Sequence, residues 1–299
     1  MGSLQYVQMA PSSADRNRPS DDDELSSGSK RMRSHVVRGQ IPQDLEEQLT
    51  QPFTEDERQR IFDSVGLSQA ERLPEGKTPI ALWLFGPPAA GKTSISDDFE
   101  VEFFGRPGNS VSIDGSHVRD AHGGFQQVLK HGIENKVIHA DAWTKLKATK
   151  HVERLKEEIF EIAVRNRQNV KICDACQKPD RVRKMLAMLE GADFEMHALC
   201  LWVPEVATQS RGQHRSVESR RVVCSSLYAS STVATLDFAK HWDQQIRQGN
   251  MHYKSLVLLD NTPRPPLRIS LEEFEARTNW PAAESAQHFQ RFQTNKNEG

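Results

Sequence analysis

The chain has 299 residues, 27% of them charged, and a formal net charge of −2. This near-neutral balance gives no indication of a polyanionic partner such as nucleic acid. No apolar run is long enough for a membrane-spanning helix, and the N-terminus lacks the basic-then-apolar order of a signal peptide. Four cysteines are too few for a disulfide scaffold, so we expect a reducing, cytoplasmic setting. From the charge and the apolar runs, we expect no nucleic-acid and no membrane partner.

The N-terminal part is polar. Residues 1–43 are expected to form a disordered tail, because their composition cannot bury a core. Within this tail, Lys30–Arg33 read KRMR, which is typical of a localisation patch or of a plain solvated tail. The next segment, 44–77, is expected to be helical, with Thr54 placed to cap a helix over 54–65.

Apolar runs of strand length alternate with helical patterns over residues 78–262. The runs predict five strands, over 79–85, 110–115, 169–175, 194–204 and 255–261. Helical spacing predicts helices over 92–104, 138–167, 179–190 and 205–248. Such alternation predicts an α/β fold in which helices cover both faces of a parallel sheet. Residues 263–299 are expected to form a C-terminal extension, with a short helix over 271–277 before a polar tail.

A glycine-containing loop follows the first of these strands. Gly86–Thr93, GPPAAGKT, matches G-x-x-x-x-G-K-[ST] without a mismatch. Glycines let such a loop curve closely around a phosphate, to which backbone N–H groups donate hydrogen bonds. Pro87 and Pro88 have no N–H, so the donors have to come from Ala89 onward. The alternative interpretation is an ordinary turn that carries an exposed lysine.

The loop therefore predicts a site for ATP and magnesium. Lys92 is expected to reach the β- and γ-phosphates, and the Thr93 hydroxyl is expected to bind Mg²⁺. The positive end of the following helix favours the same anion. The loop residues expected to bind ATP are Gly86, Ala89, Ala90, Gly91, Lys92, Thr93 and Ser94.

The second predicted strand leads into IDGSHVRDAHGGF, Ile113–Phe125. Asp114 follows its carboxyl end, the edge at which open α/β sheets bind ligands. The Asp114 carboxylate is expected to hold Mg²⁺ or to accept the proton of an attacking hydroxyl, with a helix cap as the alternative. Arg119 is expected to bind a phosphate of either substrate, and His122 to orient the acceptor. A surface ion pair and an ordinary loop position are the alternatives for these two residues.

The order of these motifs resembles the zeta toxin family of P-loop kinases. IDGSHVRDAHG is similar to the family's strand followed by D-x-D-x-x-[RK]-x-x-H-P. NVKICDACQKPDRVRKMLAMLEGADFE resembles the family's third strand, loop and helix. LWVPEVATQSRGQHR places Arg215 on a phosphate-binding arginine, and ESRRVV places Arg221 on a second one. LVLLDN resembles the last strand, after which Asn261 lies near the base of ATP. The likeness covers about 78–262.

This resemblance implies a parallel five-stranded P-loop NTPase sheet of the adenylate-kinase type. It also implies an ATP-dependent kinase whose small-molecule acceptor offers an alcohol group, because the family phosphorylates UDP-N-acetylglucosamine at the sugar 3′-hydroxyl. Arg215 and Arg221 are then expected to clamp the transferred phosphate. Together with Lys92 and Asp114, they are the expected catalytic residues.

The acceptor side departs from the family pattern. The family's general base falls on Ser116, and its proline falls on Gly123. The acid and the hydroxyl that hold the sugar nucleotide fall on Cys173 and Ala175. Three interpretations stay open: Asp114 acts as the base, the acceptor is a different alcohol or phosphate, or the protein binds nucleotide without catalysis. Because phosphoryl transfer depends mainly on positioning and charge, a kinase with a changed acceptor is favoured.

Three further interpretations compete. IDGSHVR also resembles adenylylsulfate kinase, although the long helical insert and the paired arginines argue against it. Cys173 and Cys176 form a C-x-x-C typical of zinc or redox sites, but Cys200 and Cys224 offer no second close pair, so loop residues at the sheet edge are favoured. The non-enzymatic alternative is a nucleotide-regulated interaction module that meets a protein partner through 44–75.

Overall fold

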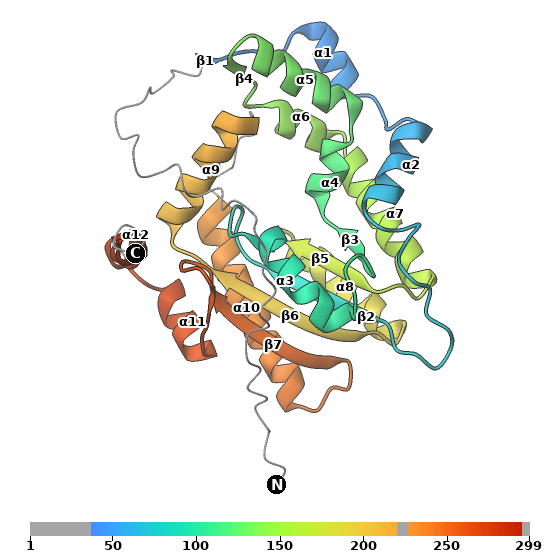
Figure 1. Ribbon diagram of the computed structural model, residues 1–299, viewed down its shortest axis with the longest axis vertical. Helices are drawn as coiled ribbons and strands as arrows, with labels where there is room; N and C mark the ends of the chain where they lie inside the picture. Colours follow the sequence, from blue (N-terminus) through green and yellow to red (C-terminus); the bar gives the residue numbers. More distant parts are fainter. Residues whose placement is uncertain (1–36, 220–226, 295–299) are drawn as a thin grey trace. The chain divides into compact units, whose positions relative to one another are not determined.

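The computed structural model describes residues 37–219 and 227–294, and its centre is a sheet with the strand order β3-β5-β2-β6-β7-β8 (Figure 1). The first five strands in this order are parallel. Their bounds are β2 (Ile80–Phe85), β3 (Val111–Ile113), β5 (Val170–Asp174), β6 (Glu195–Trp202) and β7 (Tyr253–Asp260). All five predicted strands are therefore present, and the parallel α/β fold is confirmed.

The sheet nevertheless has six strands, so the expectation of five strands is wrong at one edge. After β7 the chain turns back through the proline-rich segment 262–266, and β8 (Leu267–Arg268) pairs antiparallel with β7. In this register Leu259 faces Arg268. A two-residue edge strand leaves no apolar pattern in the sequence from which it can be recognised.

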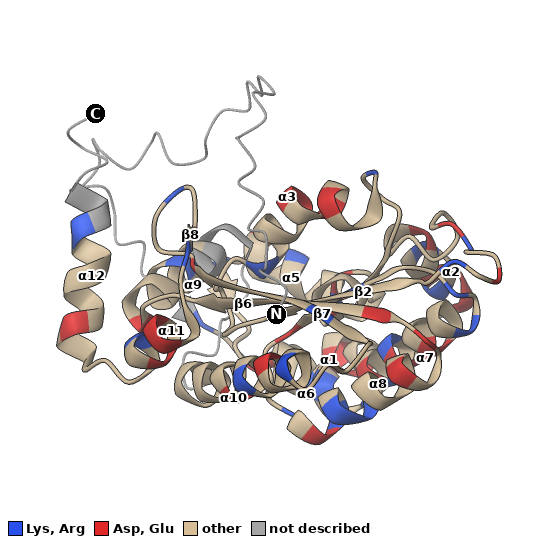
Figure 2. Ribbon diagram, turned by 90° about the horizontal axis from the view of Figure 1, so that it is seen from below, with Lys and Arg blue, Asp and Glu red and all other residues tan. Residues whose placement is uncertain are grey.

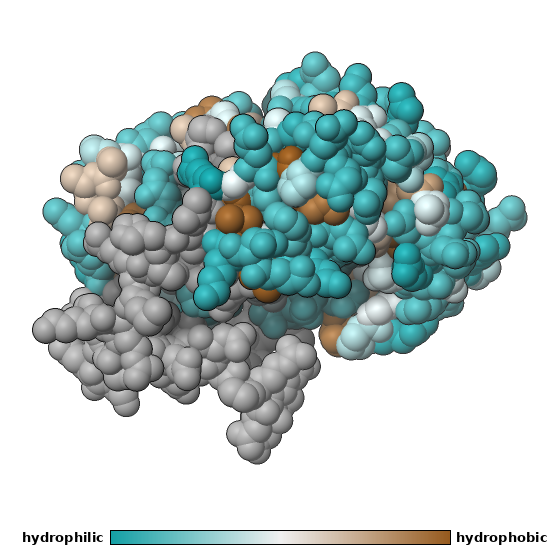
Figure 3. All heavy atoms as spheres, turned by 90° about the horizontal axis from the view of Figure 1, so that it is seen from above, coloured by the Kyte–Doolittle hydropathy of each residue, from teal (hydrophilic) through white to brown (hydrophobic). Residues whose placement is uncertain are grey.

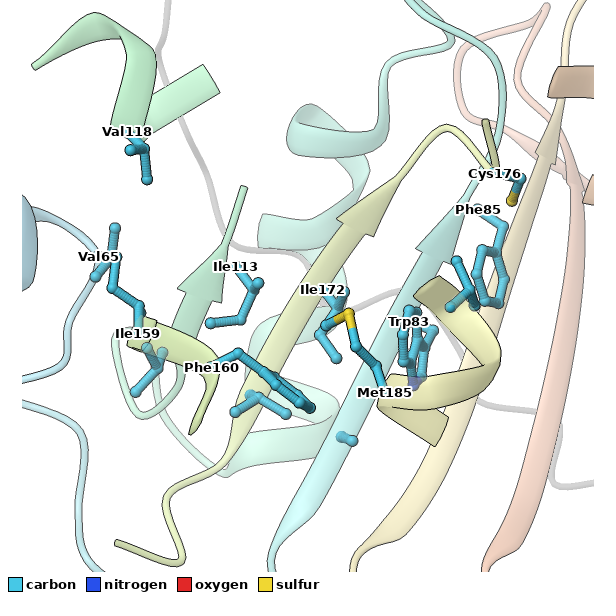
Figure 4. Close-up of a cluster of buried hydrophobic side chains, with 14 of the residues drawn as sticks. Val65, Trp83, Phe85, Ile113, Val118, Ile159, Phe160, Ile172, Cys176 and Met185 are labelled. Atoms are coloured by element: carbon cyan, nitrogen blue, oxygen red, sulfur yellow. The ribbon is translucent and has the colours of Figure 1, made fainter. Parts of the chain in front are cut away.

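Strand β2 is apolar throughout because both of its faces are buried. Trp83 and Phe85 belong to the larger of two core clusters, whereas Leu82 and Leu84 belong to the smaller one. This division follows from the alternation of side chains along a strand. Figure 4 shows Trp83 and Phe85 on the side of β2 that faces Met185 of the neighbouring helix.

Helices cover both faces of the sheet, and acidic and basic residues are interspersed along them (Figure 2). On one face lies α3 (Lys92–Phe104), which matches the predicted helix and packs Ile95, Phe99 and Phe103 onto the smaller cluster. The other face is covered by α7 (His151–Arg165), α8 (Pro179–Gly191) and α10 (Tyr228–Arg247).

The helix predicted over 138–167 is interrupted. Strand β4 (Val137–Ile138) is followed by α6 (Ala142–Ala148), and α7 begins after Lys150. Lys150 has a φ of 62°, in the left-handed region, and a residue in that conformation ends a right-handed helix. The helix predicted over 205–248 is likewise represented by α9 (Glu205–Ser219) and α10, with 220–226 outside the described residues.

The stretch after β3 contains two helices that were not predicted, α4 (Gly115–Asp120) and α5 (Gly123–Glu134). Each begins at a polar side chain. Asp114 caps α4 by accepting a hydrogen bond from the backbone N–H of Ser116, and His122 caps α5 by accepting one from the N–H of Phe125. The two candidate site residues therefore stand at helix starts.

The N-terminal segment is part of the same core. Strand β1 (Val37–Arg38) pairs with β4, so the folded part begins inside the predicted tail, and it continues through α1 (Gln43–Leu49) and α2 (Glu55–Ser64). Thr54 caps α2 as predicted, and Glu57 completes a capping box with it. Leu49 and Ile61 are fully buried, and α1 packs against α5 (Figure 1).

The C-terminal extension also folds onto the domain. Helix α11 (Leu271–Thr278) matches its prediction and packs on α10, with Phe274 fully buried. Helix α12 (Ala282–Thr294), where a polar tail was expected, packs against α9. In residues 37–219 and 227–294, no helix combines the length and the apolar character that a membrane span requires. The face seen in Figure 3 is mostly hydrophilic, with separate small hydrophobic areas.

Candidate active site

The loop between β2 and α3 forms a tight turn before the helix. The N–H of Ala90 donates to the carbonyl of Pro87 at 3.2 Å, and Ala89 takes a φ of 60°. Gly91 is the N-cap of α3, so no side chain caps the first amides of this helix. The amides of residues 92–94 are therefore the ones that the helix itself leaves for an anion.

Gly91 is required by both its conformation and its surroundings. Its φ is 91°, and a Cβ atom added to it would lie 2.5 Å from Nδ2 of Asn261. That amide nitrogen donates to the carbonyl of Ala90 at 2.6 Å. Asn261 itself is fully buried at the end of β7. The structure therefore joins Asn261 to the loop over residues 86–93, and the roles of both toward ATP stay predictions.

Arg211 is a site residue that the sequence interpretation missed. It lies on α9, and its guanidinium donates to the carbonyl of Ala90 at 3.3 Å and to the carbonyl of Asn261 at 2.9 Å. It thus bridges the loop and the exit of β7. The sequence feature from which Arg211 could have been recognised is its position in the helix that follows β6 at the ligand-binding edge of the sheet.

Lys92 lies folded over the loop. Its Nζ donates to the carbonyls of Gly86 at 2.7 Å and Pro87 at 3.0 Å. Burial lowers the pKa of Lys92, an effect that the neighbouring Cys173 and Asp114 partly oppose. An ammonium held over the concave side of a loop of this kind is placed to move onto a phosphate.

Thr93 and Asp114 line the same cavity, which has a volume of about 310 Å³. Its lining is polar and also includes Glu100 and Lys171, whose charged atoms lie 3.7 Å apart. A hydroxyl and a carboxylate in one cavity are the kind of groups that bind Mg²⁺, which proteins hold through one or two side chains together with phosphate and water. Within the described residues, no group of three or more His, Cys, Asp or Glu side chains forms a metal site without help from a ligand.

The Asp114 carboxylate is stabilised in its charged form. Burial raises its pKa, but hydrogen bonds from Ser116 and the positive charge of Lys156 outweigh burial, so the net pKa lies below the usual range. A carboxylate with a lowered pKa is a weak base and a good metal ligand. Ser116 is the position at which the family resemblance implies a general base. Here its backbone N–H donates a hydrogen bond to the Asp114 carboxylate at 2.8 Å.

His122 and Gly123 bind the N-terminal segment. His122 is 2% exposed, and its Nε2 lies 2.9 Å from the carbonyl of Gln51. The N–H of Gly123 donates to the Glu57 carboxylate at 2.6 Å, and a Cβ atom on Gly123 would lie 2.5 Å from that carboxylate. Proline, which the family pattern has here, lacks this N–H. Glycine at this position supplies the N–H that joins α5 to the Glu57 side chain of α2.

Arg119 lies on the same helical insert. Its Nε donates to Asp120 at 2.8 Å, and its guanidinium lies over the rings of Phe125 and Trp143, at 5.4 Å from each centroid. The predicted roles of Arg119 and His122 toward the acceptor remain predictions, because these contacts are made within the chain itself.

A second cavity, of about 200 Å³, lies beside the first. Cys173 lines both cavities, and Gly115, which follows Asp114, lines the second one. The remaining wall comes from α6, α7, the end of β5 with the segment after it, and the start of α8, and it includes Trp143 and Lys156.

The side chains of the two predicted clamp arginines lie outside the described part of the chain. Arg215 lies on α9, one turn after Arg211, and its side chain is outside the described residues, as is the whole of Arg221.

Among the described cysteines, Cys173, Cys176 and Cys200 are buried and free. Burial raises the pKa of Cys173 to about 12, so its thiol stays protonated at neutral pH.

The parallel sheet and the loop between its central strand and α3 define a P-loop NTPase-like α/β protein. Residues 64–248 match the protein family described as Zeta toxin, so the chain belongs to the zeta toxin family. A search among curated protein sequences found no match.

Some solved structures have a fold similar to that of this chain. One comes from the PezAT chromosomal toxin-antitoxin system of Streptococcus pneumoniae, with 14% identity and a TM-score of 0.58, covering 82% of this chain and 98% of that chain. Another is the native AvrRxo1-ORF1:-ORF2 complex, with 14% identity and a TM-score of 0.51, covering 78% of this chain and 73% of that chain. At these identities the likeness concerns the fold alone.

Proposed function

We propose that the protein is an ATP-dependent phosphotransferase that moves the γ-phosphate to a hydroxyl group of a small molecule. The observation that carries this proposal is the loop from Gly86 to Thr93: Lys92 lies over it, no side chain caps α3, and Thr93 shares a cavity with Asp114. Membership of the zeta toxin family supports the same function.

In the proposed reaction the chain positions charge rather than forming covalent bonds. The amides of residues 92–94 and the Lys92 ammonium bind the terminal phosphates, while Arg211 and Asn261 hold the loop closed from the other side. Thr93 and Asp114 would hold Mg²⁺, which would neutralise charge on the phosphates. Arg215 and Arg221 are the proposed clamps on the transferred group.

The acceptor implied by the family resemblance is UDP-N-acetylglucosamine. The residues at Cys173 and Ala175 lack the acid and hydroxyl that hold this sugar nucleotide in the resemblance, so we propose an alcohol acceptor and treat the sugar nucleotide as one candidate. The experiment is a measurement of ADP release by the full chain with Mg-ATP, alone and with a panel of alcohols. ADP release that requires an acceptor supports the kinase, whereas tight ATP binding without turnover contradicts it.

The second candidate is an ATP-binding interaction module with a protein partner. It is favoured by the similar structures, which come from a toxin-antitoxin system and from a two-protein complex. The proposed contact segment, 44–75, buries Leu49, Ile61 and Val65 in the core of its own domain, so only its polar face is available to a partner. Lack of turnover with every acceptor would favour this candidate.

A further inference from the structure

The second cavity carries an excess of positive charge. Its ionisable lining consists of four cationic side chains and two carboxylates: Lys147, Lys156, Lys178, Arg181, Glu153 and Asp174. The surplus is therefore two positive charges. Since clefts lined by one sign of charge attract ligands of the opposite sign, the lining favours an acceptor that carries negative charge.

Lys156 is the most buried of these four cations. It is 7% exposed, whereas Lys147 and Lys178 are exposed. Its ion-pair partner is Asp174, at 3.9 Å. Asp174 also pairs with Arg181 at 3.2 Å, so one carboxylate faces two cations. Leaving a buried ammonium short of acceptors is costly unless a ligand supplies them.

The size of the cavity limits the acceptor. At about 200 Å³ it lies below the range of about 300–1,000 Å³ that is typical of sites for drug-sized ligands. Trp143 is part of its lining, as are Gly115, which follows Asp114, and Cys173, which also lines the first cavity. A cavity of this size accommodates the reacting end of a compact molecule.

We propose that the acceptor is a small alcohol carrying a phosphomonoester, whose phosphate lies against Lys156 while its hydroxyl points past Gly115 toward the loop. This proposal rests on the proposed kinase function. The hydroxyl oxygen forms a bond to the γ-phosphorus of ATP, the bond from that phosphorus to the β,γ-bridging oxygen breaks, and the hydroxyl proton leaves to water. The products are ADP and a bisphosphorylated alcohol.

Binding without ATP tests the pocket separately from the reaction. Glycerol 3-phosphate is titrated calorimetrically into the full chain, with glycerol and glycerate as the neutral and carboxylate probes. We expect the phosphomonoester to bind at least about tenfold more tightly than either probe, and Lys156→Met to remove that preference. Lys184→Met, at an exposed position of α8, is the matched control and leaves binding unchanged.

Kinetics then separate the two proposals. With a phosphomonoester acceptor, Lys156→Met should raise the KM for the acceptor about tenfold or more, measured at saturating Mg²⁺ because Lys156 also stabilises the charged Asp114 carboxylate. Lys156→Arg should restore part of the loss. Equal use of glycerol, glycerate or UDP-N-acetylglucosamine, or a KM that Lys156→Met does not alter, overturns the inference while the kinase stands. Lys156-dependent binding without any turnover overturns the kinase while the pocket assignment stands.

Discussion

At the scale of single residues, the loop is held by a small number of unusual backbone positions. Ala89 and Gly91 both take positive φ values, of 60° and 91°. The second of these has no space for a side chain, because Asn261 donates to the neighbouring carbonyl of Ala90. Backbone strain at such positions persists only where the surrounding structure fixes it.

Gly91→Ala is expected to weaken ATP binding about tenfold or more and to lower the free energy of unfolding by about 2 kcal/mol. The added Cβ collides with Nδ2 of Asn261, and the positive φ is unfavourable for alanine. Calorimetric titration with ATP and urea unfolding measure the two effects. Gly191→Ala, where a Cβ meets no atom within 4 Å, is the control, and equal behaviour of the two variants would contradict the loop assignment.

Asp114→Asn is expected to act through the metal. Because hydrogen bonds from Ser116 and the charge of Lys156 hold the pKa of Asp114 below its usual range against the effect of burial, the group is a better ligand than base. We expect the Mg²⁺ concentration for half-maximal turnover to rise about tenfold or more. Asp98→Asn, at an exposed position of α3, is the control. A large loss of turnover that excess Mg²⁺ does not reduce would instead identify Asp114 as the base.

At the scale of elements, a hydrogen bond from Gly123 to Glu57 joins the start of α5 to α2. The Glu57 carboxylate accepts hydrogen bonds from the N–H of Thr54 at 2.7 Å and from the N–H of Gly123 at 2.6 Å. One side chain therefore caps the first turns of two helices. The N-terminal segment thereby contacts the insert that begins after Asp114.

Glu57→Gln is expected to lower the free energy of unfolding by about 1–2 kcal/mol at pH 7. Burial raises the pKa of Glu57, but its hydrogen bonds with Thr54 and Gly123 outweigh burial, so the folded pKa is lowered. A lowered folded pKa stabilises the protein above the unfolded pKa, and this contribution disappears as pH falls through the folded value.

Urea unfolding of the Glu57 variant at pH 7 and at pH 3 measures this difference. The gap between wild type and Glu57→Gln should shrink at the lower pH. Glu55→Gln, whose carboxylate is 84% exposed, is the matched control and should show little change at either pH. A gap that stays constant with pH would show that the charge of Glu57 does not support the contact.

At the scale of the whole molecule, the C-terminal extension secures the sheet from outside the matched family region. Asp260, fully buried at the end of β7, accepts hydrogen bonds from Arg277 of α11 and His288 of α12, both at 2.7 Å. The next residue is Asn261, which holds the loop. The extension is therefore connected to the candidate ATP site through two consecutive residues.

Arg277→Ala is expected to lower the free energy of unfolding by about 3 kcal/mol, because it leaves a buried carboxylate with one partner fewer. Urea unfolding measures the loss. Arg183→Ala breaks an exposed ion pair at 2.8 Å and should cost less than about 1 kcal/mol. Similar costs for the two variants would show that the Asp260 cluster does not hold the extension.

Sequence alone predicted the parts of the molecule that depend on local pattern. The apolar run at β2, the loop at Lys92 and the cap at Thr54 are each recognisable from neighbouring residues. Contacts between distant segments were not recognisable: Arg211 reaches the loop from α9, and Asp260 is satisfied by two helices of the extension. The break at Lys150 was missed because apolar spacing continues on both sides of it.

The central claim is that this loop binds the terminal phosphates of ATP. Equilibrium titration of Mg-ATP into the full chain and into Lys92→Ala tests it most directly, with Lys184→Ala as the control. We expect wild type and the control to bind ATP equally and Lys92→Ala to lose about a hundredfold in affinity. Equal ATP affinity in all three proteins, or no ATP binding by the wild type, would contradict the claim.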